Sequence, residues 1–247
     1  MMTNFIKTMA RYLGLEVRRF IPSSSAAAQF RTMLKSQKIN LILDVGANTG
    51  QYGTELRGHV GYRGQIVSFE PMSLAHAALT KTAAKDNLWE VSPRAAIGAE
   101  HGEISINISH NSVSSSVLAI LDSHINAEPE SRYKDSETTP LVTLDSAAMK
   151  FLRDDKNVFL KIDTQGYESQ VLEGAEKTLE IVSGVQLELS LVPLYEDQML
   201  MPDLIAKMKD LGFDLWGISP TFADPESGQM LQVDGTFFKG LGKNESN

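Results

Sequence analysis

Residues 41–50 read LILDVGANTG, a short apolar run with one aspartate, followed by a bend that carries almost no side chains. The apolar run predicts a buried strand over Leu41–Val45. Glycine in the bend permits positive φ and a close approach to the backbone, and the exposed amides favour acceptors such as carboxylates. Because ligands of doubly wound sheets bind beyond the carboxyl ends of the strands, the stretch predicts a ligand site. The alternative is an ordinary turn between a strand and a helix.

Composition narrows the class of protein. The chain has 247 residues, of which 42 % are hydrophobic, enough for one sizeable core. Its net charge of −8 argues against a general nucleic-acid binder, which needs a basic face. Cysteine is absent, which excludes disulfides and a cysteine nucleophile and suits a reducing cytoplasm. Because we find no apolar run of about 18 residues and no signal-peptide core, we expect a cytoplasmic protein without a transmembrane segment.

Charge is distributed unevenly along the chain. Residues 1–38 hold seven Lys or Arg and one Glu, a net charge of +6, so the remainder carries −14. Apolar residues recur beside these bases at helical spacing, namely Phe5, Ile6, Met9, Tyr12 and Leu13. We predict a basic helical segment over 1–38 and one domain over 39–247. The segment either makes a peripheral contact with anionic lipid or an acidic partner, or packs as a helix on its own acidic domain.

Short apolar runs alternate with helical patterns from residue 39 onward. The expected strands are 41–45, 66–70, 90–97, 103–109, 141–144, 158–163, 185–190, 213–218 and 232–238, and the expected helices are 73–85, 146–153, 168–182 and 201–211. This alternation predicts an α/β fold with a doubly wound, mostly parallel sheet covered on both faces. The last two strands are joined by a turn sequence and are expected to pair antiparallel. The polar, serine-rich stretch 111–140 reads as a long insertion or a lid over a site.

The second predicted strand ends in Glu70, about 20 residues beyond the bend. An acid at that place accepts hydrogen bonds from both ribose hydroxyls of a nucleoside cofactor. A nicotinamide dinucleotide and S-adenosylmethionine both fit this pattern. The dinucleotide fingerprint needs a second glycine to admit the pyrophosphate, where this chain has Asn48. The bend therefore favours S-adenosylmethionine.

Two predicted central strands carry polar residues where apolar ones are typical. Lys161 and Asp163 share one face of the first, and Gln186, Glu188 and Ser190 share one face of the second. Burying such groups without partners costs about 1–3 kcal/mol each. If the strands are neighbours, these groups either serve a ligand or pair with one another, for example Lys161 with Glu188 or with Asp163.

Four motifs follow one another along the chain: DVGANTG at 44–50, FEP at 69–71, AAIG at 95–98, and KIDTQGYE at 161–168 followed by VLEGA at 171–175. Together they resemble the FkbM family of S-adenosylmethionine-dependent methyltransferases, over roughly residues 39–240. The first two motifs occur in many methyltransferases, and the last is more specific. The resemblance implies a Rossmann-like methyltransferase sheet, S-adenosylmethionine as cofactor and O-methylation of a sugar, glycan or polyketide hydroxyl.

The resemblance also implies the cofactor site. Gly46, Asn48 and Gly50 would line the methionine end, Glu70 would hold the ribose, and Ala96 would contact the adenine. The residues expected around the cofactor are Asp44, Gly46, Ala47, Asn48, Gly50, Gln51, Tyr52, Glu70, Pro71, Ala96, Ile97, Ser115 and Asp163. The chain departs from the family at Thr164-Gln165, where many members have Val-Glu, so the site has one carboxylate fewer.

Four residues are candidates for catalysis of methyl transfer to a hydroxyl, which a general base assists. Asp163 is the first candidate and Glu188 the second. Lys161 would keep Asp163 ionised, and His110 is recommended only by its near-neutral ordinary pKa. A divalent ion between the two carboxylates stays an alternative, and no metal ligand is assigned.

Two other classes of function compete with this interpretation. A nicotinamide-dependent oxidoreductase would need glycine in place of Asn48. A protein that binds the cofactor without catalysis would keep the fold and lack an acceptor. The acceptor is expected to be a small molecule or a glycan rather than nucleic acid, and fold alone does not identify it.

Overall fold

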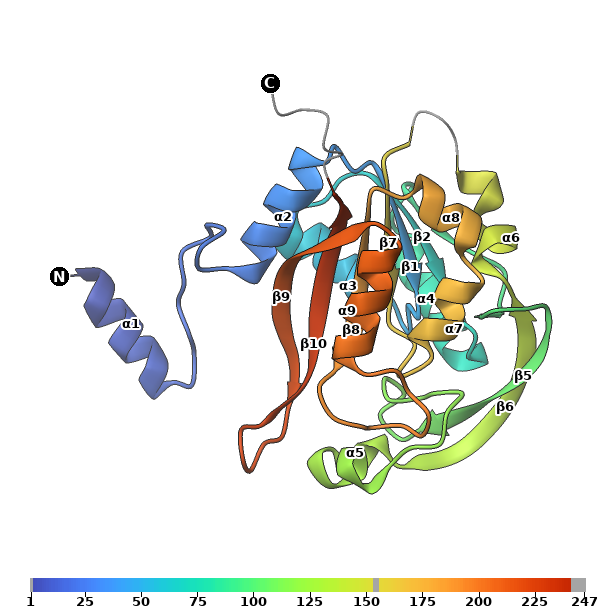
Figure 1. The fold of residues 1–247 in the computed structure, drawn as a ribbon. Coiled ribbons are helices and arrows are strands. Elements are labelled where there is room, and N and C mark those ends of the chain that lie inside the picture. The colour runs from blue at the N-terminus through green and yellow to red at the C-terminus, as the bar shows by residue number, and fades with distance from the viewer. Residues whose placement is uncertain (1, 153–155, 241–247) are drawn as a thin grey trace.

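The computed structural model describes residues 2–152 and 156–240, with side chains from residue 7 onward. Its centre is a seven-stranded sheet of order β3-β2-β1-β7-β8-β10-β9 (Figure 1). The strands are β1 (Leu41–Val45), β2 (Gln65–Phe69), β3 (Trp89–Val91), β7 (Val158–Ile162), β8 (Gly184–Ser190), β9 (Phe213–Ala223) and β10 (Met230–Lys239). Strands β1, β2, β3, β7 and β8 pair in parallel. Strand β10 pairs antiparallel with both β8 and β9. The predicted doubly wound sheet with an antiparallel last strand is confirmed.

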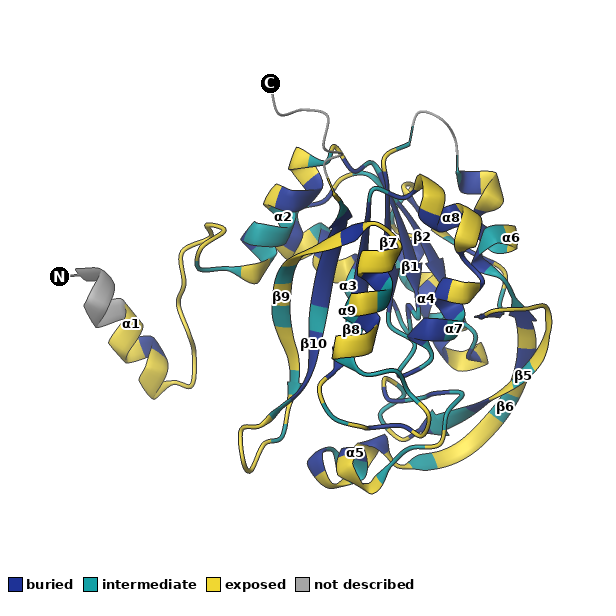
Figure 2. Cartoon of the chain, viewed as in Figure 1, coloured by how far each residue is buried: buried dark blue, intermediate teal, exposed yellow. Residues whose placement is uncertain are grey.

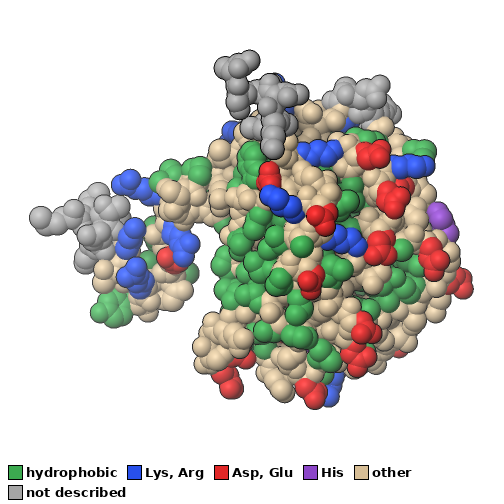
Figure 3. Space-filling view, viewed as in Figure 1, with side chains coloured by type: hydrophobic (Ala, Val, Ile, Leu, Met, Phe, Trp, Pro, Cys, Tyr) green, Lys and Arg blue, Asp and Glu red, His purple; other side chains and the backbone are tan. Residues whose placement is uncertain are grey.

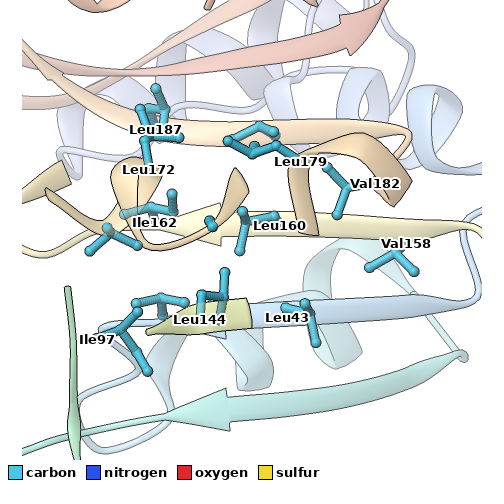
Figure 4. Close-up of a cluster of buried hydrophobic side chains, with 14 of the residues drawn as sticks. Leu43, Ile97, Leu144, Val158, Leu160, Ile162, Leu172, Leu179, Val182 and Leu187 are labelled. Atoms are coloured by element: carbon cyan, nitrogen blue, oxygen red, sulfur yellow. The ribbon is translucent and has the colours of Figure 1, made fainter. Parts of the chain in front are cut away.

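Helices cover both faces of this sheet. On one face, α2 (Ala26–Ser36), α3 (Gln51–Glu55), the π-helical turn η1 (Leu56–Val60) and α4 (Ser73–Ala83) pack with side chains such as Ile42 and Phe159. On the other face lie α6 (Leu144–Ala148), η3 (Met149–Phe151), α7 (Glu168–Glu173), α8 (Glu176–Ile181) and α9 (Met201–Asp210). Figure 4 shows part of this second cluster, in which Leu43 lies beside Leu144 of α6, and Leu160 lies on the side of Leu172 and Leu179 of α7 and α8.

The double cover explains the composition of the central strands. All five residues of β1 are buried, because successive side chains enter opposite layers that are both closed by helices. Burial of each Leu, Ile or Val side chain contributes about 1.5–3 kcal/mol. A strand that buries apolar residues on both of its faces is therefore stable only in the middle of such a sheet, which is where β1 lies.

A second sheet has three strands in the order β4-β6-β5, formed by β4 (Ala96–Ile97), β5 (Gly102–Ser109) and β6 (Tyr133–Val142). Between β5 and β6 lie α5 (Asp122–Ala127) and the short 3₁₀ helix η2 (Pro129–Ser131). The stretch 111–140, predicted as a long insertion or a lid, therefore includes most of β6, because the chain pairs with β5 from residue 133 onward.

Two other predicted elements are divided in the structure. The strand expected over 90–97 forms the ends of β3 and β4, in different sheets, because Pro93 between them has no N–H to donate. The helix expected over 168–182 breaks into α7 and α8 at Gly174. A Cβ added at Gly174 would lie 1.9 Å from the carbonyl oxygen of Gly98, so two backbones meet there too closely for a side chain.

The basic segment 1–38 has two parts. Helix α2 belongs to the body of the domain, because Met33 and Leu34 are buried in the core cluster beside β1. Helix α1 (Met2–Tyr12) instead stands clear of the body on a connection with exposed residues (Figures 1 and 2). Among the described residues, no helix is long and apolar enough to cross a membrane.

Candidate active site

A pocket of about 320 Å³ opens at the carboxyl ends of the central parallel strands. That volume lies within the range of small-molecule sites. The pocket lies beside β1, where the order of strands reverses between β2 and β7, the position at which doubly wound sheets bind ligands. Segment 112–117, which follows β5, forms another wall. The prediction that the serine-rich stretch lies over a site therefore agrees with this part of the structure.

The bend after β1 is held by contacts within the protein. The amides of Gly46 and Ala47 both donate to the carbonyl oxygen of Phe69, and the amide of Asn48 donates to a Glu70 carboxylate oxygen at 2.7 Å. Gly46 has φ +80°, and a Cβ on it would lie 1.8 Å from the backbone oxygen of Asp163. For the amides of Gly46, Ala47 and Asn48, the expectation that the bend offers exposed amides to a ligand is wrong, because Phe69 and Glu70 already accept from them.

Glu70 follows β2 and lies at the bottom of the pocket, 2 % exposed. One carboxylate oxygen accepts the Asn48 amide and the other accepts the Met72 amide at 2.8 Å. Burial raises the pKa of Glu70 to about 7, although these two hydrogen bonds oppose the shift. The carboxyl is therefore held in one orientation by the backbone on either side.

A row of polar side chains crosses the sheet on the face that carries Asp44. Lys161 lies opposite Asp44 in the register of β1 and β7, and its Nζ is 3.3 Å from Asp44 Oδ1 and 3.4 Å from Asp163 Oδ2. Burial lowers the pKa of Lys161, but the charges of Asp163 and Asp44 together raise it by more than burial lowers it. The pKa of Lys161 is therefore above its ordinary value. Burial raises the pKa of Asp44, which Lys161 opposes. Of the two pairings that the sequence left open for Lys161, the structure has the one with Asp163, and Asp44 is a second partner.

Gln165 joins the two carboxylates that the sequence identified on β7 and β8. Its Nε2 donates to Asp163 Oδ1 at 2.8 Å and to Glu188 Oε2 at 2.6 Å. Its Oε1 accepts from the Tyr195 hydroxyl at 2.7 Å, which determines which end of the amide faces the carboxylates. Burial, followed by the nearby charge of Asp163, raises the pKa of Glu188 well above its ordinary range. Within 2–152 and 156–240, no three His, Cys, Asp or Glu side chains are grouped to hold a metal ion.

The turn that carries Gln165 is held by Glu168. Glu168 Oε1 accepts from the Thr164 amide at 2.9 Å, from the Thr164 hydroxyl at 3.2 Å and from the Gly166 amide at 3.3 Å. Gln165 and Gly166 both have positive φ, at +54° and +97°. Burial raises the pKa of Glu168 to about 7. The acid at the end of the KIDTQGYE motif therefore shapes the turn, and it does not line the pocket.

Strand β10 adds residues that the sequence interpretation missed. Asp234 pairs in register with Glu188 and lines the pocket, and Gln232 donates to Glu188 Oε2 at 2.8 Å. Burial raises the pKa of Asp234 to about 7. Gln232, Asp234 and Thr236 alternate along β10 as the polar residues do along β8. That alternation is visible in the sequence, but it places these residues at the pocket only because β10 pairs with β8.

The structure brings most of the predicted site residues together. The predicted residues that line the pocket are Gly46, Ala47, Asn48, Gln51, Tyr52, Glu70, Pro71, Ala96, Ile97, Ser115, Lys161, Asp163 and Glu188. Three predicted residues do not line it. Asp44 lies beneath the pocket against Lys161, and Gly50 lies against Trp89 and Leu79. His110 is an exposed residue just after β5.

The sheet order, the position of β10 and the pocket beside β1 define a Rossmann-like methyltransferase fold. The sequence profile of the methyltransferase FkbM domain matches residues 44–215. The chain belongs to this family. The comparison with curated protein sequences gives no match.

Two solved structures are similar to this chain at low sequence identity. Methyltransferase FkbM from Methylobacillus flagellatus KT is 13 % identical with a TM-score of 0.51, over 80 % of this chain and 43 % of that one. This chain thus spans less than half the length of that protein. Magnesium protoporphyrin IX methyltransferase from Synechocystis PCC 6803, solved with bound S-adenosylmethionine, is 8 % identical with a TM-score of 0.45, over 87 % of this chain and 78 % of that one.

Proposed function

We propose that this protein transfers a methyl group from S-adenosylmethionine to a hydroxyl of a small-molecule acceptor, such as a sugar, a glycan or a polyketide. The observation that carries the proposal is that Glu70, Asp163 and Glu188 line one pocket at the switch point of the sheet. An acid that suits a ribose and an acid that suits proton transfer are thereby within reach of one bound molecule. Membership of the FkbM family supports the same class of reaction.

The residues around Glu70 fit the proposed cofactor. Each Glu70 carboxylate oxygen accepts one backbone N–H and keeps acceptor capacity for a ribose hydroxyl. The nearby pocket wall is apolar, with Phe69, Met72 and Ile97 among the lining residues, and suits a flat adenine ring. S-adenosylmethionine would supply the electrophilic methyl carbon.

Asp163 is the proposed general base. Its side chain is 32 % exposed, it lies 3.4 Å from the Lys161 ammonium, and it accepts from Gln165. When the acceptor hydroxyl is methylated, Asp163 would take the proton that the hydroxyl gives up. Lys161 and Gln165 hold the carboxylate in place, so that much of the acceleration comes from positioning.

Glu188 is less suited to this role, because burial and the nearby charge of Asp163 raise its pKa well above the ordinary range and favour its protonated form. A protonated carboxyl cannot accept the acceptor's proton. We propose that Glu188 instead helps to orient Gln165 and contacts the acceptor, together with Asp234 and Thr221 on the same wall. His110 is not part of this proposal, since it lies outside the pocket.

Calorimetry and a transfer assay test the proposal. We expect the protein to bind S-adenosylmethionine and not NADH, and to transfer labelled methyl to members of a panel of sugars and glycosides. Asp163→Asn should leave cofactor affinity within about threefold and lower turnover about 10²–10⁴-fold, the usual contribution of a general base. Full activity of this variant removes Asp163 from the mechanism. Binding of the cofactor without transfer to any acceptor favours a non-catalytic protein, and binding of NADH alone favours an oxidoreductase.

A further inference from the structure

The segment around α1 exposes an unusual concentration of large apolar side chains. We name residues 7–21 the basic arm. The exposed apolar residues of the arm are Met9, Tyr12, Leu13, Leu15, Val17, Phe20 and Ile21. Tyr12 is 84 % exposed and Leu13 74 %. Within the described body, the exposed large apolar residues are spread over several elements, as on most soluble proteins.

The same arm is strongly basic. It contains Lys7, Arg11, Arg18 and Arg19 against the single acid Glu16, which pairs with Arg18 at 2.6 Å. In the space-filling view, Lys and Arg side chains gather on this segment, whereas many acidic side chains dot the visible face of the body (Figure 3). The arm therefore presents apolar and cationic groups to solvent together.

Helical geometry separates these two kinds of side chain on α1. Lys7 and Arg11 are four residues apart and share one side of the helix. Met9 and Tyr12 are three residues apart and lie on the other side, next to Leu13 just beyond the helix. A helix with one apolar and one cationic side has the pattern of segments that lie in the interface of an anionic membrane.

The acidic body of the same chain does not cover the arm. Residues 39–247 carry −14 and are tethered to the arm, so attraction of opposite charge alone would bring the two together. The apolar side chains of the arm nevertheless stay exposed. The arm joins the body at α2, where the Phe20 ring lies 5.9 Å from the Arg31 guanidinium. The expected packing of this helix on its own domain is therefore not what the structure has.

We propose that the basic arm binds the surface of an anionic lipid bilayer. The apolar side chains enter the acyl boundary, and the basic side chains pair with anionic headgroups. The net negative charge of the body repels it from the same surface, so the arm alone makes the contact. The proposal does not depend on the reaction proposed above.

Sedimentation of the full-length chain with lipid vesicles tests the proposal. We expect binding to phosphatidylcholine vesicles that contain phosphatidylglycerol, little binding to pure phosphatidylcholine, and release at high salt because headgroup attraction is screened. The triple variant Arg11→Gln, Arg18→Gln, Arg19→Gln should bind the anionic vesicles about a hundredfold more weakly, at about fivefold for each basic side chain.

Matched apolar substitutions test whether the arm, rather than another part of the surface, makes the contact with lipid. Tyr12→Ser with Leu13→Ser should reduce binding at least tenfold. Leu74→Ser with Leu88→Ser, at residues of the body that are 86 % and 51 % exposed, should leave binding unchanged. Equal binding to both kinds of vesicle, or no effect of either arm variant, overturns the proposal. It is also overturned if the arm instead docks on a second copy, in which case the chain without vesicles self-associates and the arm variants are monomeric.

Discussion

The bends after β1 and after β7 both line the pocket and both contain residues with positive φ, but they are held in different ways. In residues 46–50 the chain takes positive φ at Gly46, Asn48 and Gly50, and backbone groups supply many of the hydrogen bonds. In residues 163–168 the chain takes positive φ at Gln165 and Gly166, and the Glu168 side chain supplies the hydrogen bonds. The first bend depends on the absence of side chains, and the second depends on the presence of one.

The two bends therefore have different roles in the pocket. The first brings the β1 and β7 ends close enough that only glycine fits between them, and it places Asn48 against Glu70. The second holds an amide, that of Gln165, between two carboxylates. Backbone contacts therefore shape the bend on the proposed cofactor side of the pocket, whereas side-chain contacts shape the bend on the proposed acceptor side. Substitutions on the first side should act mainly on folding and cofactor binding, and those on the second side on chemistry.

Gly46→Ala is the strongest test of the first bend. The new Cβ would lie 1.8 Å from the Asp163 backbone oxygen at a residue with φ +80°. We expect a loss of about 2–5 kcal/mol in the free energy of unfolding, from overpacking and the left-handed backbone. Urea denaturation measures it. Gly58→Ala is the matched control, since a Cβ there meets open space, and it should change stability by less than about 1 kcal/mol.

Glu168→Ala tests the second bend. Loss of the acceptor leaves the Thr164 and Gly166 amides without their partner, at a cost of about 2–4 kcal/mol by urea denaturation. Glu168→Gln keeps an oxygen acceptor and should stay within about 1 kcal/mol of the unsubstituted protein. Equal losses in the two variants would show that the charge of Glu168, rather than its acceptor oxygen, holds the turn.

Gln165→Glu sharpens the comparison by adding a further carboxyl to the acceptor side. The new group would sit beside Asp163 and Glu188, so its pKa is expected to rise. When the pKa of an acid is higher in the folded than in the unfolded protein, the protein becomes less stable as pH increases through the folded pKa. We therefore expect the variant to be destabilised by about 1–3 kcal/mol at pH about 8 and by less at pH about 5. Gln165→Met, which adds no charge, should show a weaker dependence on pH. A flat profile for Gln165→Glu would contradict the network.

The pH dependence of cofactor binding is the smallest expected effect. Glu70 has a pKa of about 7 because it is buried, and its ionised form is the better acceptor for ribose hydroxyls. Affinity for S-adenosylmethionine should therefore fall as pH decreases below about 7, by up to about tenfold per pH unit. Calorimetry across this range measures the slope. Glu70→Gln should bind more weakly at high pH and lose most of the slope, and an unchanged slope would exclude Glu70 as its source.

Prediction from sequence succeeded where a pattern is local. The strand predicted over 41–45 matches the observed bounds of β1, and the alternation of Lys161 with Asp163 predicted that both side chains lie on one side, where they pair. Sequence-based prediction failed where the role of a residue depends on a partner that is distant in the chain. The alternating polar residues of β10 join the site only because Asp234 lies opposite Glu188. Likewise, the bend amides are occupied because β2 offers the Phe69 carbonyl and Glu70.

The sequence by itself determined the fold class, the family and the strand ends at which polar residues collect, because side-chain alternation and turn glycines are properties of short stretches of chain. The tertiary structure alone decided which of these groups face a ligand and which satisfy one another. Lys161 could have paired with either neighbour, and Gln165 was only a departure from a family motif. Hydrogen bonds form between atoms within about 3 Å, and only packing of the strands and loops brings residues more than 20 positions apart to that distance.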